Sequence, residues 1–224
     1  MNYAKRIFSI FILFIISQIG ITAFGVIKQL SLDAGEKNLN ISSTLVTVIL
    51  VVINILFLIY LAKRMNIIKT NHPFLTKKNI LIILVATLID RGIAIGGTLL
   101  LNMQGHTTTA NDSTLIKLFS GVSPVLVVLL LGIAAPIMEE IVFRGGIIGY
   151  LVENNALLAI LISSFLFGII HGPTNFISFG MYFFMGIILS VSYYKTKDLR
   201  VSISIHFLNN LFPAIAIAYG LMRV

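Results

Sequence analysis

Six residues able to take part in acid–base or hydrogen-bond chemistry lie within or beside strongly apolar segments of the chain. They are Glu139, Glu140, Arg144, His171, His206 and Asn210. The two glutamates follow the run 122–138, which holds no charged residue. Ionisable groups are expensive to place near hydrocarbon, so such a cluster predicts a functional site in a membrane. Two carboxylates, two imidazoles and an amide are suited to activating water there.

The spacing of the glutamates predicts different roles for them. On a helix with about 100° per residue, Glu140 and Arg144 are neighbours four positions apart, whereas Glu139 points about 140° away from Arg144. We therefore expect Arg144 to pair with Glu140 and keep it ionised, which leaves Glu139 free to face a cavity as a general base. The alternative is that both glutamates are solvated charges at a helix end.

The two histidines belong to similar four-residue patterns. Phe167 and His171 share one helical face, and so do His206 and Asn210. An imidazole beside a carboxamide can donate hydrogen bonds to a developing oxyanion, or it can provide a metal ligand next to an orienting amide. The alternatives are a structural histidine at a helix end and interhelical hydrogen bonds, which membrane helices use widely.

In these three patterns the chain resembles the CPBP family of membrane-embedded peptidases, which includes CAAX prenyl endopeptidases and bacteriocin-processing or self-immunity (Abi) proteins. Glu139, Glu140 and Arg144 fit E-E-x-x-x-R. Phe167 and His171 fit F-x-x-x-H, and His206 with Asn210 fits H-x-x-x-N. The resemblance covers about residues 120–212, and residues 1–114 form a variable N-terminal part without an assigned motif.

The resemblance implies a glutamate-dependent endopeptidase. Glu139 and His171 would hold and deprotonate the attacking water, while His206 and Asn210 would stabilise the tetrahedral oxyanion. The family has also been described as metal-dependent, which would make Glu139, His171 and His206 ligands of Zn²⁺. The chain lacks the compact H-E-x-x-H arrangement that favours zinc, so the metal question stays open.

The composition limits the class of protein. The 224 residues are 58% hydrophobic and only 11% charged, whereas soluble domains carry about 25% charged residues. The chain has no cysteine, which excludes disulfides and thiolate zinc ligands. The net charge of +8 comes mainly from short basic stretches beside apolar spans, which orient membrane proteins, so we do not expect nucleic acid as a partner. The lipid bilayer is the expected environment, in a bacterial plasma membrane.

Apolar segments near the length that a bilayer requires predict an all-α, polytopic transmembrane helix bundle of about seven spans. The segments are Ile7–Ile27, Thr44–Ala62, Ile80–Leu101, Leu115–Met138, Ala156–Ile170, Phe176–Tyr194 and Val201–Met222. No repeat or soluble insert divides them, so residues 1–224 are one membrane domain. The first segment follows Lys5 and Arg6 and is expected to be retained as a span.

Lysine and arginine set the expected orientation. The second connection carries Lys63, Arg64, Lys69, Lys77 and Lys78, and the loop 195–200 carries three more, while 102–114 has none. The positive-inside rule then places the N-terminus inside. Seven spans put Glu139 and His206 toward the cytoplasmic side but His171 at the far end of a short span. Either 145–172 contains a break or a re-entrant helix near the site, with glycines such as Gly145 accommodating it, or water reaches a deep site.

Two further features of the spans favour structural interpretations. Asp90 and Arg91 lie within the third span, and we favour a structural ion pair with partners elsewhere in the bundle over a role in a substrate cavity. The aromatic residues between Tyr182 and Tyr194 are interpreted as lipid-facing or packing residues.

The sequence thus favours an intramembrane endopeptidase that cleaves membrane-associated peptides or proteins, such as leader peptides or bacteriocins. A non-catalytic immunity or scaffold protein would keep the same motifs and act by binding. A transporter would use the charges as an ion path, but transporters often contain internal repeats and none is found here.

Overall fold

The computed structural model describes residues 3–68, 73–152 and 154–221, and within these ranges its regular structure is helical, without strands. Lys69 and Met222, which belong to the sequence predictions above, lie outside the described residues. The elements are α1 (Tyr3–Asp33), α2 (Ile41–Arg64), α3 (Lys77–Met103), α4 (Ala110–Phe119), α5 (Pro124–Val127), η1 (Val128–Ala134), α6 (Ala135–Glu140), η2 (Ile141–Leu151), α7 (Ala156–Ile170), α8 (Phe176–Thr196) and α9 (Leu199–Ala218). The elements η1 and η2 are π-helical.

Polar side chains in the loops decide where most of these helices begin. The side-chain oxygen of each capping residue accepts a hydrogen bond from a backbone N–H of the first turn, which has no intrahelical partner. These caps are Asn40, Thr76, Thr109, Ser123, Asn155, Asn175 and Asp198. Long apolar runs between the caps then propagate as helix.

The segment that carries the glutamates differs from the predicted fourth span. Leu115 lies in the short helix α4, and Gly121, with a φ of +72°, turns the chain before Ser123 caps a new helix with Pro124 in its first turn. From there α5, η1, α6 and η2 follow without interruption as one helical segment, Pro124–Leu151. The prediction that the span ends at Met138 was therefore wrong, and the glutamates lie inside it.

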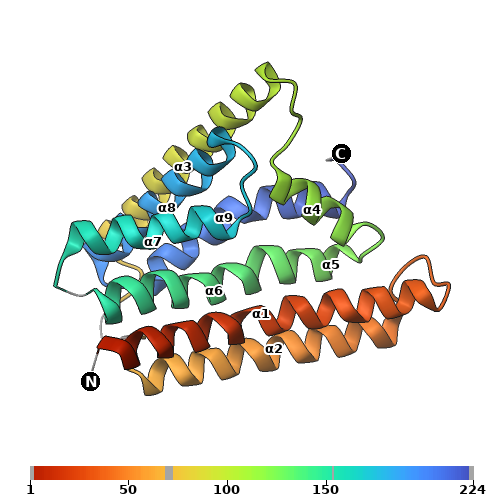
Figure 1. The fold of residues 1–224 in the computed structure, drawn as a ribbon, viewed down its shortest axis with the longest axis horizontal. Helices are drawn as coiled ribbons and strands as arrows, with labels where there is room; N and C mark the ends of the chain where they lie inside the picture. The colour runs from red at the N-terminus through yellow and green to blue at the C-terminus, as the bar shows by residue number, and fades with distance from the viewer. Residues whose placement is uncertain (1–2, 69–72, 153, 222–224) are drawn as a thin grey trace.

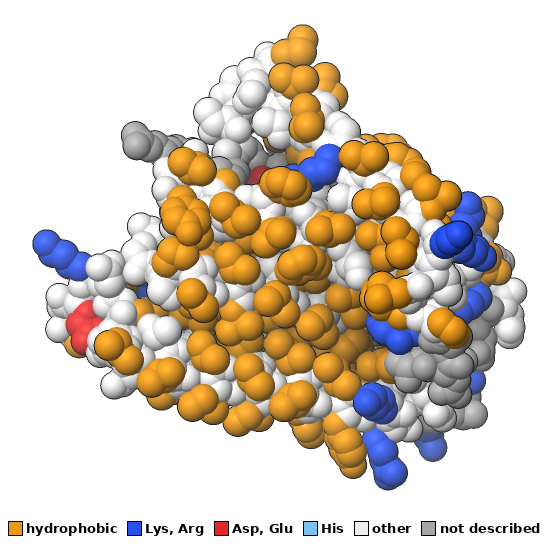
Figure 2. Space-filling model, turned by 180° about the vertical axis from the view of Figure 1, so that it is seen from behind, with side chains coloured by type: hydrophobic (Ala, Val, Ile, Leu, Met, Phe, Trp, Pro, Cys, Tyr) orange, Lys and Arg blue, Asp and Glu red, His pale blue; other side chains and the backbone are white. Residues whose placement is uncertain are grey.

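The described residues contain six helical segments long and apolar enough to cross a membrane: α1, α2, α3, Pro124–Leu151, α8 and α9. Helix α7 is also apolar but has only 15 residues. Large apolar side chains cover the outer surface, and in Figure 2 most lysine and arginine side chains gather toward one edge of the molecule. The protein is a multi-pass, all-α membrane protein, as predicted.

Packing between helices places the segment Pro124–Leu151 at the centre of the bundle. Helices α1 and α2 lie side by side and contact it on one side, and α7, α8 and α9 contact it on another (Figure 1). Helix α3 packs against α8 and α9. The Asn54 amide joins α1 to α2, because it donates to Ile16 O at 2.9 Å and accepts from Gly20 N at 3.2 Å.

The short helix α7 explains how Glu139 and His171 reach similar depth. Glu139 precedes the end of η2 at Leu151 by twelve residues, and His171 follows the start of α7 at Ala156 by fifteen. At about 1.5 Å per residue, both lie roughly 20 Å from that shared end. No break occurs at Gly145, which is helical and packs closely against Ile67 and Leu199. The chain breaks instead after Leu151 and at His171.

Candidate active site

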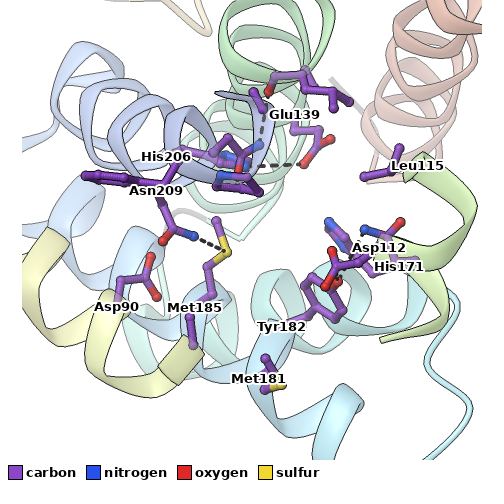
Figure 3. A pocket seen from close by; sticks show the side chains of 18 of the residues that line it. Asp90, Asp112, Leu115, Glu139, His171, Met181, Tyr182, Met185, His206 and Asn209 are labelled. Atoms are coloured by element: carbon purple, nitrogen blue, oxygen red, sulfur yellow. Dashed lines mark hydrogen bonds and ion pairs between the residues drawn. The ribbon is translucent and has the colours of Figure 1, made fainter. Parts of the chain in front are cut away.

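A cavity of about 550 Å³ is lined by residues of α1, α3, α4, η1, α6, α8 and α9 and by the end of α7. Its wall contains four of the six predicted site residues: Glu139, His171, His206 and Asn210. Figure 3 shows Glu139 and His206 on one side of this cavity and His171 on another. Glu140 and Arg144 do not line the cavity, so the structure separates the two adjacent glutamates as the helical spacing predicted.

Arg144 and Glu140 form an ion pair in the interior of the bundle. Nη1 of Arg144 donates to Oε1 of Glu140 at 2.9 Å, and both side chains are 0% exposed. Nη2 of Arg144 donates to the carbonyl of Gly186 at 3.2 Å, and the guanidinium lies 4.4 Å from the centre of the Phe167 ring. The predicted contact between Glu140 and Arg144 is therefore present, and it ties the glutamate helix to α7 and α8.

Glu140 also holds His206. Its Oε1 lies 3.0 Å from Nδ1 of His206, and because a carboxylate only accepts hydrogen bonds, Nδ1 carries the hydrogen in this contact. Nε2 of the same ring then points toward Glu139, 3.9 Å from Oε2. That distance is too long for a hydrogen bond. The contacts fix the orientation of the imidazole and leave the 21%-exposed Glu139 side chain accessible to the cavity.

His171 occupies the end of α7, where a helix leaves carbonyl groups without partners. The His171 N–H bonds to Ile169 O, so Phe167 O lacks its usual partner four residues on, and Nδ1 of His171 lies 2.7 Å from it. Because a carbonyl only accepts, Nδ1 carries the hydrogen, and in the neutral ring the lone pair is on Nε2. The four-residue spacing of Phe167 and His171 thus sets the tautomer of the ring.

Tyr182 completes the surroundings of His171. The two rings are stacked, with centroids 4.2 Å apart and an angle of 16° between their planes. The Tyr182 hydroxyl lies 2.9 Å from Oγ1 of Thr109, accepts from Nδ2 of Asn111 at 3.2 Å and donates to Oδ1 of Asp112 at 3.4 Å. The interpretation of Tyr182 as a lipid-facing or packing residue was wrong, because it lines the cavity and connects His171 to α4.

Asn210 holds α9 against the π-helical segment η1. The N–H of Ala135 bonds to the carbonyl of Leu130, five residues back, which is the π-helical pattern. In this pattern the carbonyl of Leu131 faces the nitrogen of Pro136, which has no hydrogen to donate. Nδ2 of Asn210 donates to Leu131 O at 3.2 Å instead. One hydrogen of the Asn210 amide is thereby used, and the second remains for another acceptor.

Asp90 and Arg91 do not form the structural ion pair that we favoured from the sequence. Nη2 of Arg91 donates to Oδ1 of Asn209, and its guanidinium lies 5.6 Å from the centre of the Phe212 ring. Oδ2 of Asp90 has no hydrogen-bond partner among the described residues. Both side chains line the cavity, so the structure favours the second interpretation, in which this pair contributes to a cavity wall.

The residues proposed as zinc ligands do not fit a three-ligand site as they are arranged. Among the described residues, no group of three His, Asp or Glu side chains is placed to hold a metal ion. Nδ1 of His206 and Nδ1 of His171 face Glu140 and Phe167 O, which leaves both Nε2 atoms open, as in metal-binding histidines. The placement of the three side chains, and not the orientation of the imidazole rings, is what gives no support to a preformed zinc centre made of Glu139, His171 and His206.

Comparison with known proteins agrees with the motifs. Residues 121–212, which contain all six candidate site residues, match the model of a family described as type II CAAX prenyl endopeptidase Rce1-like. The chain is 35% identical over 105 residues to protein YvdC of Lactococcus lactis and 41% identical over 90 residues to the membrane-embedded CAAX protease MroQ of Staphylococcus aureus. This segment is therefore similar to CPBP peptidases, in agreement with the three motifs. No solved structure matches the chain.

The match to CPBP proteins is partial. The aligned segments are 47% and 37% of this chain, and they cover 40% of YvdC and 36% of MroQ. The chain thus spans less than half the length of these curated relatives. Asp90 and Asp112, which line the same cavity as the CPBP motif residues, lie outside the residues that match the family model.

Proposed function

We propose that the chain is a membrane-embedded endopeptidase that hydrolyses a peptide bond in its cavity. The observation that carries this proposal is that Glu139, His171, His206 and Asn210 line a single cavity. These residues come from α6, the end of α7, and α9. The neighbouring Glu140 is held out of the cavity by Arg144 and instead orients His206.

The first step is the attack of water on the substrate. A water molecule between the Glu139 carboxylate and Nε2 of His171 attacks the carbonyl carbon of the peptide bond, and Glu139 accepts the proton that the water loses. Because Nδ1 of His171 faces Phe167 O, its Nε2 is the atom that can accept a hydrogen bond from this water. Glu139 then returns the proton to the leaving nitrogen as the carbon–nitrogen bond breaks.

His206 and Asn210 stabilise the tetrahedral oxyanion. The free N–H of the Asn210 amide donates one hydrogen bond, and Nε2 of His206 donates a second. Since Nδ1 of His206 already donates to Glu140, a donor at Nε2 requires a doubly protonated ring. This requirement assigns Glu140 a positioning role. Its carboxylate accepts a hydrogen bond from Nδ1 of the imidazolium and lies outside the cavity.

The substrate class follows from the position of the cavity. Apolar side chains such as Met181, Met185 and Ile217 line much of it, and it lies among membrane-spanning helices. A membrane-associated peptide or protein segment meets these conditions, and leader peptides and bacteriocins are examples of this class. The curated relative MroQ carries a name that describes a CAAX protease.

The test is proteolysis by the purified chain in lipid vesicles. Membrane-associated peptides are incubated with the wild type, Glu139→Ala and Asp33→Ala, and the products are identified by mass spectrometry. Asp33 is an exposed acidic residue at the end of α1 and serves as the matched control. We expect Glu139→Ala to lower the rate by about a hundred- to ten-thousandfold, because it removes the general base. A folded wild type that cleaves no peptide would favour an immunity or scaffold role.

A further inference from the structure

Asp90 is a buried acidic residue in the cavity wall for which the proposed mechanism has no use. Asp90 lies in the middle of α3 and is only 2% exposed. It lines the same cavity as Glu139. Figure 3 shows its carboxylate on the α3 side of the cavity, near Met185 and Asn209. Oδ2 has no hydrogen-bond partner among the described residues.

The nearest cation in sequence does not neutralise this carboxylate through a hydrogen bond. Adjacent residues on a helix point about 100° apart, and Arg91 directs its guanidinium to Asn209 and the Phe212 ring. Arg91, His206 and Arg144 act on the Asp90 carboxylate through their charges, but no described residue donates a hydrogen bond to Oδ2. A buried carboxylate oxygen without a donor is costly within a membrane span, so it indicates a ligand. A hydrogen-bond donor that enters the cavity would satisfy it.

The surroundings of Asp90 favour a cationic donor. The acidic residues that line the cavity are Asp90, Asp112 and Glu139, and the basic residues among the described lining residues are Arg91, His171 and His206. With His206 charged as the mechanism requires, three carboxylates face two cationic side chains. Met181, Met185 and Ile93 provide apolar surface in the same wall. A lysine or arginine side chain combines an apolar stem with a cationic head, so its stem can pack on the methionines while its head reaches a carboxylate.

We propose that Asp90 forms a substrate subsite for a lysine or arginine side chain near the bond that is cleaved. This inference depends on the proposed endopeptidase function and adds the chemistry of substrate choice. Asp90 lies outside residues 121–212, so the selectivity belongs to the N-terminal part of the chain while the hydrolytic groups belong to the CPBP segment.

The experiment uses the full chain in vesicles and a panel of membrane-associated host peptides. Lysine is moved through each position on both sides of the cleaved bond, and each peptide is paired with one that carries norleucine, which has a similar stem without the charge. The measured quantity is the ratio of kcat/KM for the lysine and norleucine peptides. Wild type, Asp90→Asn, Asp90→Glu and the charge control Asp33→Asn are compared.

We expect the wild type to prefer lysine at one position by about ten- to a hundredfold, as a hydrogen bond between charged groups allows. Asp90→Asn should lose this preference, Asp90→Glu should retain part of it, and Asp33→Asn should keep it in full. A wild type that cleaves the panel without preferring lysine anywhere overturns the subsite and leaves the endopeptidase function intact, whether or not the variants fold. An unchanged ratio in folded Asp90→Asn also overturns the subsite. A wild type that cleaves none of the peptides overturns both proposals.

Discussion

Replacing Arg144 by alanine tests the electrostatic arrangement behind the site. In the wild type the guanidinium donates to Glu140 at 2.9 Å and to Gly186 O at 3.2 Å, and it lies over the Phe167 ring. Arg144→Ala removes these contacts and leaves the Glu140 carboxylate at 0% exposure beside His206. The variant should therefore lose both stability and activity.

The size of the effect follows from burial. Removing one member of a buried ion pair costs about 3–5 kcal/mol, because the other charge stays buried and unpaired. The hydrogen bond to Gly186 O adds about 1 kcal/mol. Glu140→Gln in the same chain removes the unpaired charge, so the double variant should recover about 1–3 kcal/mol relative to Arg144→Ala alone. His206 can offset part of the lost charge, which keeps the recovery below the full cost.

The free energy of unfolding is measured by titrating SDS into mixed micelles that contain the wild type, both single variants and the double variant. Arg64→Ala is the control, because Arg64 is exposed at the end of α2, and it should change stability by no more than about 0.5 kcal/mol. Strictly additive effects of Glu140→Gln and Arg144→Ala would refute the ion pair as the reason for the loss.

Three other measurements address the rest of the site. Asn210→Ala should lower kcat about a hundredfold with little change in KM. It should also lower the free energy of unfolding by about 1–3 kcal/mol, because the Leu131 carbonyl loses its donor. An unchanged kcat would remove Asn210 from the oxyanion site. Enzyme freed of metal by chelation should keep full activity, and recovery that depends on added zinc would contradict this. Burial raises the pKa of Asp112 above its ordinary value, so the folded protein retains a proton there that the unfolded chain has lost. Stability should fall as pH rises from the ordinary carboxyl range through the raised pKa, and Asp112→Asn should remove this dependence; an identical pH profile in the variant would show that Asp112 does not cause it.

Contacts within one helix were predictable from the sequence. The pairing of Glu140 with Arg144 and the separation of Glu139 follow from helical spacing alone, because both residues of the pair belong to one continuous helix. The same holds for Phe167 and His171, which lie one turn apart at the end of α7. These local relations need no knowledge of how the helices pack.

The bounds of the fourth span were missed although a signal was present. Ser123 and Pro124 form a cap and first-turn pattern that starts a helix, but the largely apolar segment from Leu115 to Met138 was interpreted as one span. The charged residues at 139–144 also suggested an end to the span. They are tolerated inside it because Arg144 neutralises Glu140 in the interior of the bundle.

Contacts between helices were not predictable, because the sequence does not specify the register of one helix against another. Glu140 and His206 are in contact although they are 66 positions apart in the sequence. The Tyr182 hydroxyl likewise donates to Asp112, which is 70 positions away. The role of Asn210 as a donor to Leu131 O depends on the π-helical pattern before Pro136. A helical spacing argument that assumes 3.6 residues per turn cannot anticipate it.

The central claim is that Glu139 and His171 act together on one water molecule, and a double-variant comparison of peptide cleavage tests it most directly. The values of kcat/KM are measured in vesicles for wild type, Glu139→Ala, His171→Ala and the variant that carries both changes. Groups that act as a unit have strongly non-additive effects, so we expect each single change to lower kcat/KM by about a hundred- to ten-thousandfold and the double change to cost no more than either. Wild-type cleavage in either single variant, or losses that simply multiply in the double variant, would contradict the claim.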